Sequence, residues 1–436
     1  MTEEKKKNIT CAILSGIFLA LASSNENWGF VVFIGIIPLL HALDNSESPF
    51  ERFLLGFLTG VIHLEISAIW VANYSIYGWL LCSLSAIPYG IFGIIGNKKT
   101  PLETGVYWAL AELCRKSIPP LGCLPLAISC DFLPVLRLAP LGGEFLINLV
   151  IASISAILYK LPTKKIPKET WLLSIPFFLT FTQSPPKNGP ILKVGVLQTN
   201  ERNSDETFLD WAFEQKEADI ILWPEILYSD PVHNVPLQNR FATLSKTADV
   251  FVGHNLYENQ TKYNALTAFQ WNPEFSIQSY KKENPVPITE ETFAAGKKNT
   301  PFKKGELLLG TIICIEEHYS ACARKQALQG AAILLAPSNS QYYTKSGIRQ
   351  QKNAGRLRAL ETQLPLLHAT NCGESAIILG NGNIVAQTKE TKLLTANIPI
   401  SLHPPKTLLT QWGEPILALG WSLLMLLPKI LKRKKK

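Results

Sequence analysis

Charged side chains are scarce in this sequence. Asp, Glu, Lys and Arg make up 17% of its 436 residues, whereas soluble domains average about 25%. The apolar residues are also clustered. Long apolar runs fill residues 9–160 and return at 171–181 and 408–427, while residues 191–401 alternate between short apolar and polar segments. The composition therefore predicts a membrane region together with one α/β domain.

Several common functional motifs are also missing. The sequence has no Gly-rich phosphate loop, no G-x-S-x-G and no H-E-x-x-H. Its eight cysteines form no C-x-x-C pair and no metal-ligand spacing, so we predict neither a metal nor a cofactor. The net charge of +8 does not indicate nucleic acid, because Lys and Arg cluster at the ends of apolar runs and no nucleic-acid motif accompanies them.

The apolar runs predict about eight membrane-spanning helices, each near the length of about 20 residues that a bilayer requires. We expect them at residues 9–23, 29–43, 53–72, 76–96, 103–118, 142–160, 170–183 and 408–427. Lys and Arg mark cytoplasmic loops, and here they precede the first and third helices, follow the fourth, separate the sixth from the seventh and end the chain. An even number of spans then predicts two cytoplasmic termini and a block outside the cytoplasm between the last two helices.

Three regions follow from this pattern. Residues 1–185 are expected to hold the first seven helices, residues 190–402 a catalytic domain, and residues 405–436 the last helix with a basic cytoplasmic tail. Short β-branched or apolar runs predict buried strands in the middle region: Lys193–Gln198, Ile220–Pro224, Val250–Gly253, Ala265–Trp271, Leu307–Ile315 and Ala332–Ala336. Arg349–Thr362 is predicted to be a helix, and Asn381-Gly382 a hairpin turn. Strands mixed with helices are typical of a layered α/β domain.

Polar residues close three of the apolar or turn-forming segments. Glu225 follows Ile220–Pro224, Cys314 lies near the end of another predicted strand with Glu316 beside it, and Lys282 precedes a proline-containing turn. Strand ends are where α/β domains place their chemistry. Each residue alone is more typical of a surface charge or a structural thiol, but Glu, Lys and Cys in this order favour a catalytic site.

These segments resemble the three signatures of the nitrilase superfamily, which has a four-layer αββα sandwich. Trp223-Pro224-Glu225 and Cys314-Ile315-Glu316 match two of them, and Lys282 to Glu290 keeps the spacing of the lysine motif K-x-x-L-V-P-F-G-E. The apolar segments narrow the resemblance to the apolipoprotein N-acyltransferases. The chain departs from that family at Ile315, where an aromatic residue is usual, and at residues 340–343. The resemblance implies an α-helical membrane bundle joined to an αββα domain.

The resemblance also implies a reaction. Cys314 would attack a phospholipid ester and form a thioester, Glu225 would be the general base, and Lys282 would stabilise the oxyanion, together with the backbone N–H of Ile315. A nearby lysine should also favour the thiolate. The acceptor would be the N-terminal diacylglyceryl-cysteine of an apolipoprotein at the outer face of the bacterial inner membrane. Two groups of residues complete the predicted site: Glu290 and Glu316 as supporting carboxylates, and Gln198, Asn200, Ser338 and Asn339 as substrate-binding residues.

Three other interpretations remain open. A membrane-tethered amidase of the nitrilase type would share the three catalytic residues, and a non-enzymatic membrane scaffold could carry a decayed nitrilase domain. Retention of Glu225, Lys282 and Cys314 together argues against the scaffold. His318, four residues after Cys314, could form a Cys–His dyad, although Glu225 already supplies a base.

Overall fold

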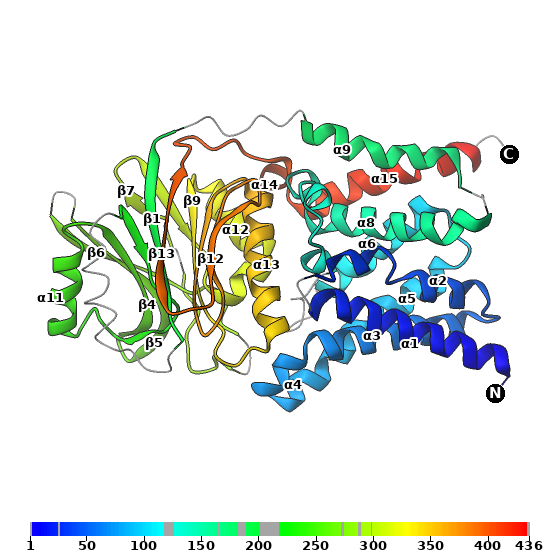
Figure 1. Ribbon diagram of the computed structural model, residues 1–436, viewed down its shortest axis with the longest axis horizontal. Helices are drawn as coiled ribbons and strands as arrows, with labels where there is room; N and C mark the ends of the chain where they lie inside the picture. Colours follow the sequence, from blue (N-terminus) through cyan, green and yellow to red (C-terminus); the bar gives the residue numbers. More distant parts are fainter. Residues whose placement is uncertain are drawn as a thin grey trace. The chain divides into compact units, whose positions relative to one another are not determined.

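The computed structural model describes residues 2–24, 27–116, 126–163, 166–181, 189–200, 218–271, 274–286, 289–297 and 299–433. The chain forms two compact units (Figure 1). The first combines Met1–Gln183, Thr344–Gln350 and Trp412–Lys436, and the second combines Ser184–Tyr343 and Gln351–Gln411. The first unit is mainly helical, and all the strands among the described residues belong to the second.

Helices form in each of the eight predicted membrane segments. Proline lies in the first turn of several of them, where its missing N–H costs nothing. The side chain of Ser48 caps one helix by accepting a hydrogen bond from the backbone N–H of Glu51. The helices of this unit are α1 (Glu3–Ser24), α2 (Ile37–Asp44), α3 (Pro49–Ser67), α4 (Ile76–Leu81), α5 (Ile87–Gly96), α6 (Pro101–Lys116), α7 (Leu133–Leu136), α8 (Ala139–Lys160), α9 (Ser174–Phe181) and α15 (Glu414–Arg433).

Four helical segments in the described residues are long and apolar enough to cross a membrane: Glu3–Ser24, Ile76–Gly96, Ala139–Thr163 and Glu414–Leu431. The other predicted spans are helical but shorter or more polar. Gly29–Asp44 is a shorter apolar helix, α9 has eight residues, and α3 carries Glu51, Arg52 and Glu65. The chain is therefore a membrane protein with about four candidate spans.

The second unit is built on two mixed sheets. The strand order of the first sheet is β13-β1-β2-β4-β5-β6, with β3 beside β4, and that of the second is β12-β11-β10-β9-β8-β7. The first sheet contains β1 (Ile191–Gln198), β2 (Ile220–Leu222), β3 (Tyr228–Ser229), β4 (Asp249–Glu258), β5 (Thr261–Trp271), β6 (Phe275–Lys281) and β13 (Lys392–Pro399). The second contains β7 (Phe302–Lys304), β8 (Leu307–Thr311), β9 (Ile333–Asn339), β10 (Leu366–Asn371), β11 (Ser375–Ile378) and β12 (Ile384–Thr388).

The alternation of side chains along these strands creates three apolar cores. On β2, Ile220 and Leu222 belong to a core that contains residues of both sheets, so the sheets pack face to face. Ile221 points to the opposite side, into a core with α11 (Val235–Leu244). A third core joins the outer side of the second sheet to α12 (Ser320–Leu328) and α13 (Lys345–Thr362). The unit is thus a layered α/β domain in which two mixed sheets pack face to face and helices cover the outer side of each sheet.

One predicted strand ends earlier than expected. The sequence predicted a strand from Leu307 to Ile315, but β8 ends at Thr311 and a single 3-10 turn, η7, covers Cys314–His318. The turn begins because Cys314 adopts a left-handed backbone with φ of +50°, which a strand cannot continue. The predicted hairpin is confirmed: β11 and β12 pair antiparallel, and Gly382 in their turn has φ of +81°.

Candidate active site

The direction of the strands brings the predicted base, Glu225, and the predicted oxyanion-stabilising residue, Lys282, to one edge of the first sheet. Glu225 follows β2, and Lys282 directly follows β6. β2 runs parallel to β4, and two antiparallel steps lead from β4 through β5 to β6. β2 and β6 therefore end at the same edge. Asn264 lies near the start of β5, which runs in the opposite direction, so it belongs to this edge too.

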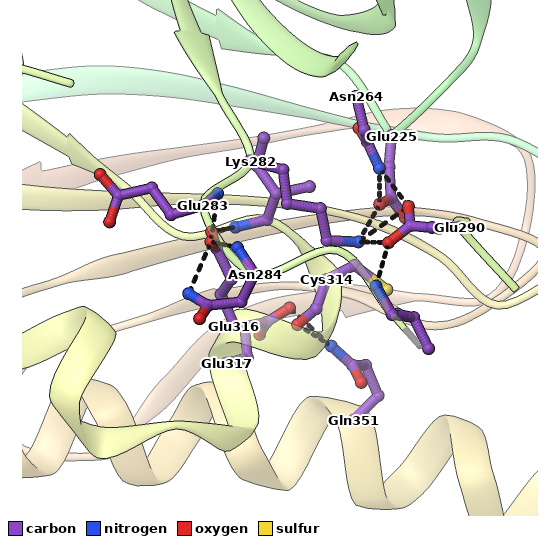
Figure 2. Close-up of polar contacts among 12 residues, drawn as sticks. Glu225, Asn264, Lys282, Glu283, Asn284, Glu290, Cys314, Glu316, Glu317 and Gln351 are labelled. Atoms are coloured by element: carbon purple, nitrogen blue, oxygen red, sulfur yellow. Dashed lines mark hydrogen bonds and ion pairs between the residues drawn. The ribbon is translucent and has the colours of Figure 1, made fainter. Parts of the chain in front are cut away.

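A buried cation and an amide hold two carboxylates together there (Figure 2). Lys282 Nζ lies 3.0 Å from Glu225 Oε1 and 2.9 Å from Glu290 Oε2. Asn264 Nδ2 donates to both carboxylates, at 2.6 Å to Glu225 and 2.7 Å to Glu290. The side chains of Lys282 and Glu225 are 1% and 4% exposed. Buried charges are unfavourable unless they are paired and hydrogen-bonded, and this cluster supplies both kinds of contact.

The thiol comes from the second sheet. Cys314 is buried in the core between the sheets and begins η7. Its φ of +50° is matched by that of Ile226, which follows Glu225 and has φ of +51°. A left-handed backbone costs a residue with a Cβ about 1–2 kcal/mol, and such strain clusters at functional sites. Both strained residues lie at the points where the chain turns to present a predicted catalytic side chain.

The Cys314 thiol holds its proton strongly. Burial is the largest cause, and the negative charge of Glu225 is the second; together they raise the pKa of the Cys314 thiol to about 12. Lys282, the Ser338 hydroxyl and the backbone N–H of Asn339 lower it by less. Lys282 therefore favours the thiolate, as expected, but burial and Glu225 outweigh its effect on the thiol pKa. Because the thiolate is the nucleophile, this thiol needs a base to remove its proton.

The pKa values of Glu225 and Lys282 are both raised, which suits a general base and a permanently charged cation. Burial raises the pKa of Glu225, and nearby Glu290 adds to the rise, while Lys282 opposes it. Burial would lower the pKa of Lys282, but Glu225, Cys314 and Glu290 outweigh burial and raise it overall. Glu225 is thus a stronger base than an exposed carboxylate, and Lys282 keeps its positive charge.

Glu316 joins the lysine loop to the backbone that precedes the thiol. Its Oε1 accepts hydrogen bonds from the backbone N–H groups of Glu283 at 2.8 Å and Asn284 at 3.0 Å. Its Oε2 accepts from the N–H of Ile313 at 2.8 Å. Glu316 is fully buried, and this burial raises its pKa, while the Ile313 N–H opposes the rise. The carboxylate is therefore placed to fix the distance between Lys282 and the thiol.

Ser338 and Asn339, at the end of β9, lie beside the thiol. The carbonyl of Ser338 also accepts a hydrogen bond from the backbone N–H of Glu225 at 3.3 Å. The second sheet thus holds both the thiol and, through this backbone bond, the base. Substrate binding by Ser338 and Asn339 stays a prediction.

Gln198 and Asn200 make contacts within the domain. Gln198 is fully buried, and its Oε1 accepts from the N–H and the hydroxyl of Ser375 at 2.9 and 2.7 Å. Asn200 donates to the carbonyl of Lys389 at 2.8 Å. These bonds account for a structural role, and substrate binding by the two residues also stays a prediction.

The Nε2 of His318 lies 2.9 Å from the Oε1 of Gln351. This contact directs the ring to α13, so the geometry does not favour the Cys–His dyad. Gln351 itself and Asn264 are two members of the site that the sequence reasoning missed. For Asn264 the available signal was a polar residue directly before the predicted strand Ala265–Trp271. For Gln351 it was a glutamine inside the predicted helix Arg349–Thr362.

Part of the predicted lysine motif, residues 287–288, lies outside the described residues. Within the described part of the chain, no group of three or more His, Cys, Asp and Glu side chains is arranged to hold a metal ion. The chemistry that the described residues support is nucleophilic attack by Cys314, with Glu225 accepting the thiol proton and Lys282 facing the developing negative charge.

Two family models match the chain. One, described as carbon-nitrogen hydrolase, matches residues 186–403, and the other, described as the apolipoprotein N-acyltransferase N-terminal domain, matches residues 15–157. An apolipoprotein N-acyltransferase of Gloeobacter violaceus is 22% identical and covers 96% of this chain and 93% of its own length. One of Coxiella burnetii is 24% identical and covers 93% of this chain and 96% of its own.

Among solved structures, an amidase of the nitrilase superfamily from Nesterenkonia is 17% identical, with a TM-score of 0.44, over 55% of this chain and 100% of that one. A carbon-nitrogen hydrolase from Helicobacter pylori is 19% identical, with a TM-score of 0.42, over 52% of this chain and 95% of that one. Both matches are weak in sequence and cover about half of the chain.

Proposed function

Because the chain belongs to the apolipoprotein N-acyltransferase family, we propose that it transfers a fatty acyl chain from a phospholipid to the N-terminal amine of a diacylglyceryl-cysteine on an apolipoprotein. The observation that carries the proposal is the buried cluster in which Glu225 and Lys282 form an ion pair and interact electrostatically with the Cys314 thiol. The candidate membrane spans support a lipid donor, since both proposed substrates carry acyl chains.

The first half-reaction forms a thioester. Glu225 accepts the thiol proton as the sulfur of Cys314 bonds to the ester carbonyl carbon of the phospholipid. The carbonyl oxygen becomes an oxyanion, which the Lys282 ammonium and the backbone N–H of Ile315 stabilise; one such donor contributes about 3 kcal/mol. When the intermediate collapses, the ester C–O bond breaks and Glu225 returns the proton to the leaving alkoxide. The products are a lysophospholipid and an acylated Cys314.

The second half-reaction uses the same groups in the reverse order. The amine of the acceptor attacks the thioester carbonyl, and Glu225 accepts its proton. The C–S bond then breaks, the proton passes from Glu225 to the thiolate, and the amide product leaves. Splitting a difficult ester-to-amide transfer into two steps lowers each barrier, and the raised pKa of Glu225 suits a group that must both take and return a proton.

The direct test compares acyl transfer with amide hydrolysis. Purified protein in phospholipid vesicles is given a diacylglyceryl-cysteine lipopeptide or a set of small amides. We expect N-acylated lipopeptide and an equal amount of lysophospholipid, with amide hydrolysis no faster than with Cys314→Ala. Hydrolysis of amides without transfer would identify a membrane-tethered amidase instead. Neither activity, with a fully folded protein, would favour a scaffold with a decayed domain.

The proposal also requires a particular topology. We propose eight spans, two cytoplasmic termini and a catalytic unit on the periplasmic side of a bacterial inner membrane. Three of the four candidate spans precede β1 and one follows β13, so four spans place the catalytic unit on the same side as eight would. The basic tail at residues 432–436 supports a cytoplasmic C-terminus.

Reporter fusions test this topology. An enzyme that is active only outside the cytoplasm should be active when fused after Asn259, in the turn between β4 and β5. The same enzyme should be silent when fused after Lys436. The reverse pattern would place the catalytic unit in the cytoplasm and leave the proposed acceptor without access to it.

A further inference from the structure

The side chain of Gln351 contacts both ends of the turn that carries the thiol. Its Nε2 donates to the carbonyl oxygen of Cys314 at 2.9 Å and to Glu317 Oε1 at 2.9 Å (Figure 2). Its Oε1 lies 2.9 Å from His318 Nε2. Gln351 and Glu317 are fully buried, and His318 is 2% exposed. One neutral amide thus makes three hydrogen bonds to a turn of five residues.

The fold also makes room for this contact. Glu317 Oε2 lies 3.1 Å from His368 Nδ1 on β10. A Cβ at Gly355 would come within 2.4 Å of the same oxygen. Gly355 and Gln351 are four residues apart on α13, so they share one face of that helix. This face of α13 therefore contacts both the Glu317 carboxylate and the carbonyl of Cys314.

The position of the Cys314 carbonyl decides where the next N–H points. The peptide bond between Cys314 and Ile315 is planar, and in a trans peptide the C=O and N–H point in opposite directions. Gln351 draws the C=O towards α13. The N–H of Ile315 must then point away from α13.

We propose that Gln351 is a positioning residue: by holding the Cys314–Ile315 peptide plane, it aims the Ile315 N–H at the oxyanion that forms during acyl transfer. This inference rests on the proposed function, in which Cys314 forms the thioester. Gln351 carries no charge, so it acts through the backbone and not through the thiol's electrostatics. It also stabilises the left-handed backbone of Cys314, which would otherwise relax and turn the donor away.

The test compares two reactions of the same thiol. Acylation by phospholipid builds an oxyanion, whereas alkylation by iodoacetamide displaces iodide and builds none. The variants are Gln351→Met, which removes all three hydrogen bonds at similar volume, and Gln351→Glu, whose carboxylate cannot donate to the carbonyl. The matched control is Gln326→Met, another buried glutamine, which lies on α12 in the same unit.

Single-turnover acylation in phosphatidylethanolamine vesicles is followed by intact-protein mass spectrometry. We expect both Gln351 variants to slow the acylation rate constant by about 100-fold, the usual effect of losing one oxyanion donor. In both variants the final acylated fraction and the donor concentration at half-maximal rate should stay within about twofold of the parent. The alkylation rate of Cys314 should do so in Gln351→Met, which introduces no charge. Gln326→Met should leave all four values unchanged.

Other results separate the possible failures. If Gln351 only supports folding, the acylated fraction falls and Cys314 alkylates faster, because unfolding exposes the thiol and removes the burial that raises its pKa. The acylation rate constant of the folded fraction is then kept, and the inference is overturned. Acylation of both variants at the parent rate overturns it as well. A parent protein that alkylates but never acylates contradicts the proposed function itself, and the positioning role with it.

Discussion

Replacing Glu225 by glutamine should change two reactions of Cys314 in opposite directions. Glu225 has two effects on the thiol: its negative charge raises the thiol pKa, and its carboxylate is the proposed acceptor of the thiol proton. Gln keeps the shape but has neither the charge nor the basicity. Glu225→Gln should therefore increase the fraction of thiolate at a given pH and still lower the rate of acyl transfer.

The thiol pKa sets the magnitudes. A thiol with a pKa of about 12 is ionised in about one molecule in 10,000 at pH 8, compared with about one in ten at its ordinary pKa of 9.0, because each pKa unit is a tenfold change. Parent alkylation should therefore be slow and rise about tenfold per pH unit up to about pH 11. Loss of the proton relay should slow acylation by about 100-fold or more.

The assay follows iodoacetamide alkylation of Cys314 between pH 6 and 11 by mass spectrometry, in the parent and in Glu225→Gln. We expect the variant to alkylate faster than the parent below pH 9, with its midpoint at a lower pH, and to form the acyl adduct more slowly at every pH. A parent that alkylates at a plateau rate near pH 7 would refute the raised thiol pKa. A variant that alkylates more slowly than the parent would refute the opposing effect of the Glu225 charge.

Three further predictions concern the cluster and its support. Lys282→Arg keeps the charge but not the compact ammonium that two carboxylates share, so steady-state transfer should stay near that of Lys282→Ala; parent-like turnover would make Lys282 a dispensable charge. Glu225 must lose its proton to act as the base, and its pKa is raised, so the acylation rate should rise with pH through a midpoint above the ordinary 4.5; a midpoint at or below 4.5 in a pH–rate profile would contradict this. A Cβ at Gly253 would come within 2.2 Å of the Pro224 carbonyl oxygen and 2.7 Å of the Glu225 Cα, so Gly253→Ala should lower the free energy of unfolding by about 1–3 kcal/mol. Gly195→Ala is the control in thermal unfolding, because a Cβ there would come no closer than 3.3 Å to the leucine side chain and 3.5 Å to the other neighbouring atoms; equal loss in both variants would remove the steric argument.

Local sequence patterns predicted the fold of the second unit well where a strand is buried on both faces. The run Ile220–Pro224 is apolar because one side faces the other sheet and the other faces α11. Strands with mixed composition were harder to predict. β13 has exposed and buried residues in irregular alternation, and it joins the sheet by pairing with β1, about 200 residues away in sequence, which no local pattern reveals.

The membrane unit shows a different limit. Apolar content predicted a helix in each of the eight segments, because that property is local. Whether a helix crosses a bilayer depends on its continuous length and on charges inside it, and α3 and α9 fall short on these criteria. The eight expected spans include these shorter or more polar helices, whereas four segments of the described residues meet the length and hydropathy requirement by themselves.

Glu225, Lys282 and Glu290, which strand ends and motif spacing assigned to one site, lie in contact in the structure; their catalytic roles stay predictions. Asn264 and Gln351 could not be found in this way. Each acts through a contact between elements distant in sequence: Asn264 reaches two carboxylates across the sheet edge, and Gln351 reaches the thiol turn from α13. The net shift of the thiol pKa was likewise beyond the sequence, because it depends on how deeply Cys314 is buried.

The central claim is that Cys314 carries the acyl group between donor and acceptor. The most direct measurement is intact-protein and peptide mass spectrometry of the purified protein after incubation with a phospholipid of one defined acyl chain. We expect one added acyl group on the peptide that contains Cys314, removed by hydroxylamine and by a lipopeptide amine, and absent from Cys314→Ala. A folded parent protein that acylates the lipopeptide without passing through this adduct, or a Cys314→Ala variant of near-normal activity, would contradict the thioester mechanism.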